Sequence, residues 1–316
     1  MKKKISVIGC GYWGKNLIRN YFELGCLYSV CDSDTNVASN YAEMYQTKVQ
    51  TLEEIIQDSE IDGVIIASPP VTHKELACRL LGANKNIFIE KPLCMNLNEA
   101  NLIADALANS ESVLMVGHLL HYHPGYKKLA SLVRDEGIEN IKHISSTRCA
   151  FGRIRSNEDV MWSFAPHDIS MILGLSGSFP KTIRRIDNSF IQNNLADISY
   201  LSMEFENFNA SVQVSWMHPS KEQRLIVISD KSLFIFDDTL PWSEKVSKIS
   251  YEFSKRNNES LLNKNKQEFF ALPEDTEPLK LECLHFISLL DNKVENITDI
   301  SEATNVIRVL EDSRMI

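Results

Sequence analysis

Lys91 is the residue of this 316-residue chain whose surroundings best fit proton-transfer chemistry. It follows Glu90 at the end of the short apolar run 86–89 and precedes Pro92. If a crevice closes over this lysine, burial and a nearby cationic group lower its pKa toward neutrality. The amine could then exchange a proton with a substrate hydroxyl, or hold that hydroxyl by a charged hydrogen bond. A plain salt bridge to Glu90 is the alternative interpretation.

His167 is the second candidate for proton exchange, because a neutral imidazole suits that role near pH 7. It follows Pro166, where the pattern predicts the start of a helix over 166–175. Asp168 comes next, but neighbours on a helix do not face each other, so we expect Asp168 to lie at an interface or cap. Packing at a domain interface is the alternative role for His167.

Three glycines form a G-x-G-x-x-G turn, at Gly9, Gly11 and Gly14, between the β-branched run 4–8 and a helical pattern over 12–24. In such a turn the glycines permit a tight bend, let a pyrophosphate approach the backbone and let helix and strand pack closely. The next apolar run, 27–31, ends in Asp32, a position that suits hydrogen bonds from the ribose of NAD. Asp32 would repel a 2′-phosphate, so we predict NAD rather than NADP. A structural glycine turn beside a surface aspartate is the alternative.

These residues must be positioned by the alternating strands and helices of about the first 117 residues. The pattern predicts an α/β, doubly wound parallel sheet, in domain 1–120. Ligands bind beyond the carboxyl ends of such strands. The segments 9–14, 32, 68–73 and 90–92 all follow predicted strands, so they should converge on one crevice.

The pattern changes in domain 121–316, where long runs alternate apolar and polar residues and few helices intervene. It predicts an α+β domain with a large open, mostly antiparallel sheet. A helix is expected over 124–136, and closing helices over 279–290 and 301–312. The polar segment 254–266 reads as a mobile loop.

Composition excludes several classes of partner. A net charge of -9 disfavours nucleic acid, and no stretch approaches the ~18 apolar residues of a membrane span. Seven scattered cysteines without a C-x-x-C indicate reduced thiols in a cytoplasm. His118, His121 and His123 have no cysteine or acidic residue at ligand spacing, so we expect no metal site and place them along the crevice.

The motifs together resemble the Gfo/Idh/MocA oxidoreductases, the glucose–fructose oxidoreductase and inositol dehydrogenase superfamily. The residues that carry the resemblance are GCGYWG at 9–14, Asp32, SPPVTH at 68–73, EKP at 90–92, HYHPGYKKL at 121–129, APHD at 165–168 and EPLKLECLHF at 277–286. The resemblance implies a nicotinamide cofactor, hydride transfer at a hydroxyl-bearing carbon, and sugars, inositols or sugar nucleotides as substrates. It also implies a cis Lys91–Pro92 bond, and a homodimer or homotetramer formed through the second sheet.

One departure from the family bears on the substrate. The family often shows D-x-x-x-H in the second domain, and here the histidine matches His167 while Ser163 stands at the aspartate position. A subgroup acting on UDP-activated N-acetylhexosamines and their uronates also varies there. We therefore expect a sugar-nucleotide 3-dehydrogenase that feeds amino-sugar biosynthesis, with UDP-N-acetylglucosamine or its uronate as substrate. A dehydrogenase or reductase of a free sugar or inositol, and a non-catalytic NAD-binding sensor, are the alternatives.

The resemblance and the residue types assign roles as follows. Lys91 and His167 are the expected catalytic pair. The residues expected around the cofactor are Gly9, Gly11, Tyr12, Trp13, Gly14, Asp32, Ser68, Pro69, His73, Glu90 and Lys91. The residues expected around the substrate are Lys91, His121, Tyr122, Arg153, Arg155, Ser163 and His167. Arg148 and the two other arginines could clamp a pyrophosphate, because arginine grips phosphate in a bidentate manner; a solvated run of charge is the alternative.

Overall fold

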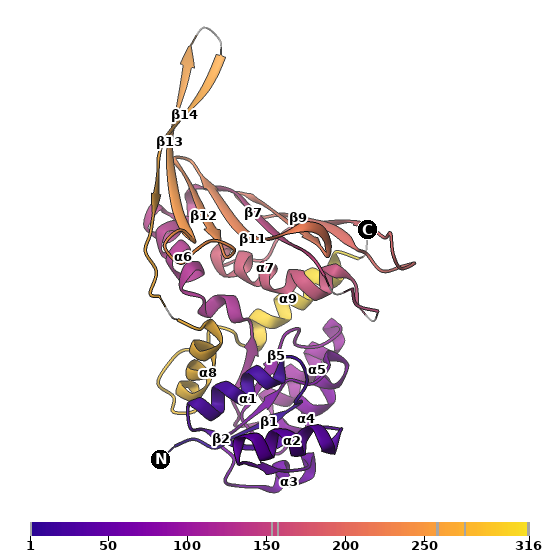
Figure 1. The fold of residues 1–316 in the computed structure, drawn as a ribbon. Coiled ribbons are helices and arrows are strands. Elements are labelled where there is room, and N and C mark those ends of the chain that lie inside the picture. The colour runs from indigo at the N-terminus through magenta and orange to yellow at the C-terminus, as the bar shows by residue number, and fades with distance from the viewer. Residues whose placement is uncertain (1, 153, 157, 257–258, 275, 315–316) are drawn as a thin grey trace. The chain divides into compact units, whose positions relative to one another are not determined.

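A computed structural model of the chain describes residues 2–314 except 153, 157, 257, 258 and 275. The chain divides into two compact units (Figure 1). The first unit contains residues 1–119 and 277–308, and the second contains 120–276 and 309–316. Each unit is built on a single β-sheet.

The first sheet is six-stranded and parallel, in the order β3-β2-β1-β4-β5-β6, which confirms the predicted doubly wound fold. Its strands are β1 (Ile5–Ile8), β2 (Leu27–Cys31), β3 (Lys48–Val49), β4 (Gly63–Ile66), β5 (Ile87–Glu90) and β6 (Leu114–Gly117). Every residue of β1, β4, β5 and β6 is buried, as continuous apolar runs require in a sheet covered on both faces. The two-residue strand β3 was not predicted.

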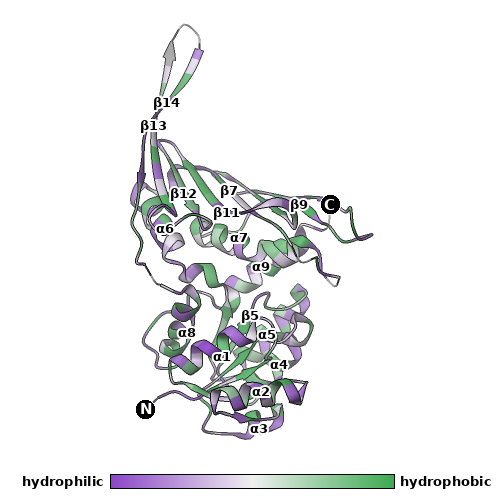
Figure 2. Cartoon of the chain, viewed as in Figure 1, coloured by the Kyte–Doolittle hydropathy of each residue, from purple (hydrophilic) through white to green (hydrophobic). Residues whose placement is uncertain are grey.

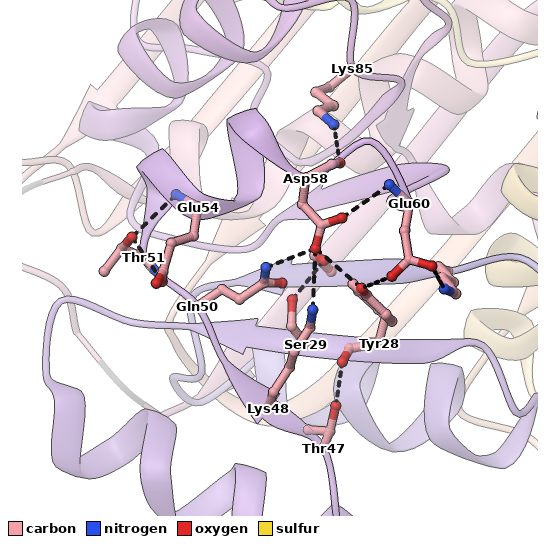
Figure 3. Close-up of polar contacts among 12 residues, drawn as sticks. Tyr28, Ser29, Thr47, Lys48, Gln50, Thr51, Glu54, Asp58, Glu60 and Lys85 are labelled. Atoms are coloured by element: carbon pink, nitrogen blue, oxygen red, sulfur yellow. Dashed lines mark hydrogen bonds and ion pairs between the residues drawn. The ribbon is translucent and has the colours of Figure 1, made fainter.

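Helices connect and cover these strands. They are α1 (Gly14–Glu23), α2 (Thr35–Tyr45), α3 (Leu52–Gln57), the 3-10 turn η1 (Pro70–Thr72), α4 (His73–Gly82), α5 (Leu97–Ala108) and α8 (Pro278–Leu289), with α9 (Ile300–Asp312) beginning in this unit. At the amino ends of the strands, Asp58 accepts hydrogen bonds from Gln50, Lys48 and Tyr28 (Figure 3). Burial opposes ionisation of Asp58, but these bonds hold its pKa well below the usual value. The polar cluster therefore fastens the end of the sheet away from the predicted crevice.

The segment 277–308 was expected in the second domain, and the structure places it in the first unit. Phe286 of α8 lies on the first sheet, with its ring centroid 5.9 Å from that of Phe88. A Cβ atom on Gly63 would come within 2.8 Å of the Phe286 ring, so the glycine makes room for this contact. Packing against the first sheet thus places the segment in the first unit, although it follows the second domain in the sequence.

The second sheet is eight-stranded, in the order β14-β13-β12-β11-β7-β10-β9-β8, and all neighbours are antiparallel except β7 and β10. Its strands are β7 (Ile141–Phe151), β8 (Thr182–Asn188), β9 (Ile198–Glu204), β10 (Asn209–Ser215), β11 (Met217–Ser229), β12 (Ser232–Asp237), β13 (Val246–Arg256) and β14 (Glu259–Phe269). Hydrophobic and hydrophilic residues alternate along strands such as β9, β10 and β12 (Figure 2). The predicted mostly antiparallel α+β domain is confirmed.

The remaining helical elements of the second unit are η2 (Leu119–Tyr122), α6 (Pro124–Glu136), η3 (Ile138–Asn140) and α7 (Val160–Ser176). Helices α6 and α7 pack on the sheet, α6 on β12 and β13, and α7 on β7, β9 and β10. In this way one face of the sheet is covered, and α7 is buried along most of its length.

The mobile loop predicted over 254–266 is wrong, because most of this segment belongs to a hairpin of β13 and β14 (Figure 1). The pairing extends through Phe253 and Leu262. All described residues of β14 are exposed, so its side chains need no apolar alternation and the sequence carries no strand period. The hairpin has no buried face on β14, and its backbone hydrogen bonds stabilise it instead.

The predicted start of α7 at Pro166 is also wrong, since the helix begins at Val160. The Asp159 side chain caps it by accepting from the backbone N–H of Trp162 at 2.9 Å. Pro166 therefore lies inside the helix and removes one backbone hydrogen bond. Burial of the apolar residues before it, Trp162 among them, compensates for that loss.

Candidate active site

The glycine turn between β1 and α1 is tight at two positions and open at the third. Gly9 has φ +98, and a Cβ there would lie 2.6 Å from the backbone of Ala67. A Cβ on Gly14 would lie 1.9 Å from the carbonyl oxygen of Gly9. At Gly11, by contrast, no atom lies within 4 Å of an added Cβ. The turn thus leaves open the place where a pyrophosphate approaches the backbone, and its residues fit a dinucleotide.

Asp32 lies beside this turn at the end of β2. One carboxylate oxygen accepts from the backbone N–H of Cys10 at 2.7 Å, and the other accepts from the backbone N–H of Asp34 at 3.0 Å. These bonds fix the carboxylate between the turn and α2 while the residue stays partly exposed. Each oxygen has further lone pairs, so the group can still accept from ribose hydroxyls.

Tyr12 and Trp13 occupy the two variable positions of the turn. Tyr12 is 76% exposed, and the Lys15 ammonium lies 5.1 Å from its ring centroid. Trp13 reaches across to β5, where its indole Nε1 donates to Glu90 Oε1 at 2.5 Å. Trp13 therefore ties the dinucleotide turn to the end of β5, directly before Lys91.

Lys91 is the first residue after β5 and is half-buried. Its backbone N–H lies 3.3 Å from Glu90 Oε2, to which it donates. The Lys91–Pro92 peptide bond is cis, as the resemblance implies. Because β1 and β5 belong to one parallel sheet, Lys91 and the glycine turn lie at the same, carboxyl edge of that sheet.

His73, expected beside the cofactor, has both ring nitrogens engaged within the protein. It is fully buried, and its two ring nitrogens each lie 2.9 Å from a backbone carbonyl oxygen, one of Ser68 and one of Pro92. Burial lowers its pKa. The ring thus links the turn after β4 to the turn after β5, and this link helps to fix the positions of Ser68 and Pro69. The Ser68 hydroxyl itself pairs with that of Thr72 at 2.7 Å.

In the second unit, Ser163 and His167 lie one turn apart on α7, so they share a face of the helix. Ser163 is buried and His167 is half-buried. Asp168 has partners of another kind: Arg148 Nε donates to it at 2.7 Å and the Ser146 hydroxyl at 2.6 Å. The aspartate therefore fastens α7 to β7.

His118, His121 and His123, which follow β6, each bond to a different side chain. His118 donates to Glu302 at 2.5 Å in the first unit. In the second unit, His121 lies 2.7 Å from the Ser170 hydroxyl and His123 lies 3.1 Å from Asp238. Tyr122 is buried. Over the described part of the chain, no three His, Cys, Asp or Glu side chains gather in a way that could hold a metal ion.

The three arginines considered as a phosphate clamp differ in their surroundings. Arg148 is engaged with buried Asp168 and is not exposed to a ligand in the way a clamp requires. Arg155 pairs with Glu158 at 3.0 Å and keeps about half of its side chain exposed, 48%. Arg153 lies outside the described residues. Of the described pair, only Arg155 is left for that role.

Sequence reasoning missed one buried acid near the site. Glu282 of α8 is fully buried, and neither carboxylate oxygen has a hydrogen-bond partner in the described residues. Burial and the charge of Glu90 raise its pKa well above the usual value. The signal available in the sequence was a lone glutamate inside the apolar stretch 279–290.

Residues 3–118 match the model of an oxidoreductase family with an NAD-binding Rossmann fold, GFO_IDH_MocA. Among curated proteins, an oxidoreductase of Streptococcus pneumoniae is 25% identical over 65% of this chain and 60% of its own. UDP-N-acetylglucosamine 3-dehydrogenase of Acidithiobacillus ferrooxidans is 26% identical over 65% of this chain and 64% of its own. Inositol 2-dehydrogenase 2 of Paenarthrobacter aurescens is 30% identical over 56% and 57%. The alignments thus span less than two thirds of each of these relatives.

A solved structure of the Acidithiobacillus dehydrogenase superposes with a TM-score of 0.86 at 21% identity, covering 100% of this chain and 98% of that one. This similarity shows that the two chains share a fold over their full lengths. No described helix has the length and apolar character needed to cross a membrane.

Proposed function

We propose that the chain is an NAD-dependent dehydrogenase of a sugar nucleotide in the Gfo/Idh/MocA oxidoreductase family, whose NAD-binding Rossmann model residues 3–118 match. The hydroxyl oxidised is that at C3 of a UDP-N-acetylhexosamine, such as UDP-N-acetylglucosamine, or of its uronate. The observation that carries this proposal is the hydrogen bond from Trp13 to Glu90 at 2.5 Å. It joins the dinucleotide turn to the residue before Lys91, so the proton-exchanging amine belongs to the cofactor site.

NAD, when bound, accepts the hydride from the reacting carbon. The hydroxyl on that carbon must lose its proton as the ketone forms, and Lys91 stands beside the cofactor turn to accept or orient it. His167 of α7 is the proposed partner from the second unit, and Ser163 on the same helix face replaces the family's aspartate. Loss of that carboxylate takes away a group that would orient His167, which places more of the proton exchange on Lys91.

The UDP-sugar is proposed on two supports. The Acidithiobacillus relative is a UDP-N-acetylglucosamine 3-dehydrogenase, and the half-exposed guanidinium of Arg155 can meet a pyrophosphate if its pairing with Glu158 is exchanged. His121 and Tyr122 complete the proposed substrate side. The 3-ketone produced would be the substrate of an aminotransferase, since transamination of a ketone gives an amino sugar.

A dehydrogenase of a free sugar or inositol is the second candidate. Its support is the Paenarthrobacter inositol 2-dehydrogenase, which is 30% identical to this chain over 56% of its length. In this case Arg155 would keep its partner Glu158 and take no part in binding.

We also propose that the second sheet joins two copies of the chain. Helices α6 and α7 pack on the sheet, and a shallow hollow on β7–β10 is lined by side chains such as Tyr200, Ile186 and Gln213. Tyr200 is 44% and Ile186 66% exposed, which are apolar surfaces that a second copy would cover. A homodimer, or a tetramer built from two such dimers, follows.

A cytoplasmic location belongs to the same proposal. The seven cysteines form no disulfide with one another, and five of them are buried. Free, scattered thiols are usual where the compartment is reducing.

The test is NADH formation with a panel of UDP-N-acetylglucosamine, its uronate, free N-acetylglucosamine and myo-inositol, each with NAD and with NADP. The proposal expects turnover of a UDP-sugar with NAD. Turnover confined to myo-inositol or the free sugar would support the second candidate. Turnover of none would contradict a dehydrogenase of either kind.

A further inference from the structure

The bond between Trp13 and Glu90 joins an exposed ring to a buried charge. Trp13 is 38% exposed, whereas Glu90 is 8% exposed. The indole N–H donates to Glu90 Oε1, and such a bond is stronger when the carboxyl group is ionised. Trp13 itself belongs to the glycine turn, two residues after the open position Gly11. The protonation state of Glu90 therefore affects the strength of a hydrogen bond made by a residue of the glycine turn.

Besides Trp13, the groups around Glu90 come from β6, from α8 and from the residue that follows β5. Gly117 of β6 pairs with Glu90 in the sheet, and a Cβ on it would lie 3.0 Å from Glu90 Oε2, so a side chain there would require the carboxyl group to shift. His118 follows β6, Lys91 follows β5, and Glu282 and Cys283 face Glu90 from α8. His118 is itself bonded to Glu302.

These groups have opposing effects on Glu90. Burial raises its pKa to about 7, against the effect of Trp13, Lys91 and His118. Glu282 has a pKa well above the usual range because of burial and the charge of Glu90. The first proton to leave this pair as pH rises is thus that of Glu90, and Glu282 stays neutral.

We propose that Glu90 is a positioning residue for the cofactor: as a carboxylate it holds the Trp13 indole in place at the dinucleotide turn, and on protonation it loosens that hold. The inference rests on the proposed binding of NAD. A hydrogen bond to an ionised acceptor is roughly twice as strong as one to a neutral acceptor, so the ring is held more firmly above neutral pH. Cofactor binding is then coupled to pH through one buried carboxyl group.

The direct test is the fluorescence of the cofactor-free protein between pH 5.5 and 8.5. The chain has four tryptophans, and subtracting the spectrum of Trp13→Phe isolates Trp13. We expect a single transition in the Trp13 signal with a midpoint near pH 7, absent in Glu90→Gln, whose amide oxygen accepts the bond at every pH. Glu282→Gln is the matched control, because it replaces a neutral acid by a neutral amide, and it should keep the transition. A Trp13 signal that is flat with pH in the wild type, or a transition that persists in Glu90→Gln, would overturn the proposal.

The second readout is the Kd of NADH by calorimetry at pH 6 and pH 8. Wild type should bind about ten-fold more weakly at pH 6, while Trp13→Phe and Glu90→Gln should bind equally at the two values. Equal wild-type affinities would overturn the positioning role and leave the proposed function standing. Failure to bind NADH at either pH would instead contradict the proposed function, and the fluorescence titration would still decide whether Glu90 controls Trp13.

Discussion

Replacing Glu90 by glutamine should stabilise the fold by an amount that grows with pH. In the folded chain the pKa of Glu90 is raised by burial to about 7, from an ordinary 4.5. Between these two values the folded state keeps a proton that the unfolded state has lost. Wild-type stability therefore falls as pH rises from about 4.5 to 7, by about 1.4 kcal/mol per pH unit. Above pH 7 both states are ionised at Glu90 and this contribution is constant.

The full difference amounts to about 3 kcal/mol. Glu90→Gln lacks the ionisation, so its advantage over wild type should increase by about 3 kcal/mol from pH 4.5 to pH 7 and then level off. The pKa of about 7 already includes the bond from Trp13, so that bond adds no further pH dependence to this difference.

Glu282→Gln provides the contrast. Because the pKa of Glu282 lies well above its usual value, the extra stability of Glu282→Gln relative to wild type should continue to increase beyond pH 7. Urea unfolding followed by circular dichroism at pH 5, 6, 7 and 8 measures both curves. The reasoning is refuted if the difference between Glu90→Gln and wild type is the same at pH 5 and pH 7, or if it shrinks as pH rises.

Two further perturbations follow from the structure. The Asp32 carboxylate should make the affinity for NAD at least about tenfold higher than that for NADP, a difference of 1.4 kcal/mol. Asp32→Ser should reduce this ratio of affinities, which calorimetry with both nucleotides measures. Equal affinities in the wild type would count against the role of Asp32. Asp168→Ala removes the partner of the Arg148 guanidinium, whose side chain is 12% exposed, and should lower the stability of the fold by about 3 kcal/mol. Thermal unfolding measures this loss. The double variant Arg148→Met/Asp168→Leu removes both charges and should recover much of it.

The first sheet could be predicted from the sequence because its signals are local. The run 4–8, the three glycines and the helical pattern after them are adjacent in the chain, and each requires the others in a strand–turn–helix unit. The buried strands β4, β5 and β6 follow from continuous apolar runs. The position of Lys91 at the carboxyl edge then follows from topology alone.

Other features depend on contacts that sequence order does not show. The bond between Trp13 and Glu90 joins residues far apart in the chain, and nothing near either residue indicates it. His73 looked like a ligand-binding residue, yet its ring nitrogens are engaged by two backbone carbonyls. The hairpin of β13 and β14 lacked a hydrophobic period because its second strand is exposed on both faces.

The measurement that tests the central claim most directly is kcat of Lys91→Met on a verified substrate, together with its Kd for NAD. General acid–base catalysis is worth at least about 100-fold, so kcat should fall by that factor or more. The Kd for NAD should change little, since the contacts to pyrophosphate and ribose are proposed at 9–14 and Asp32. His167→Asn should lower kcat by a smaller factor. A Lys91→Met enzyme with near-normal kcat would contradict the assignment of proton exchange to this lysine.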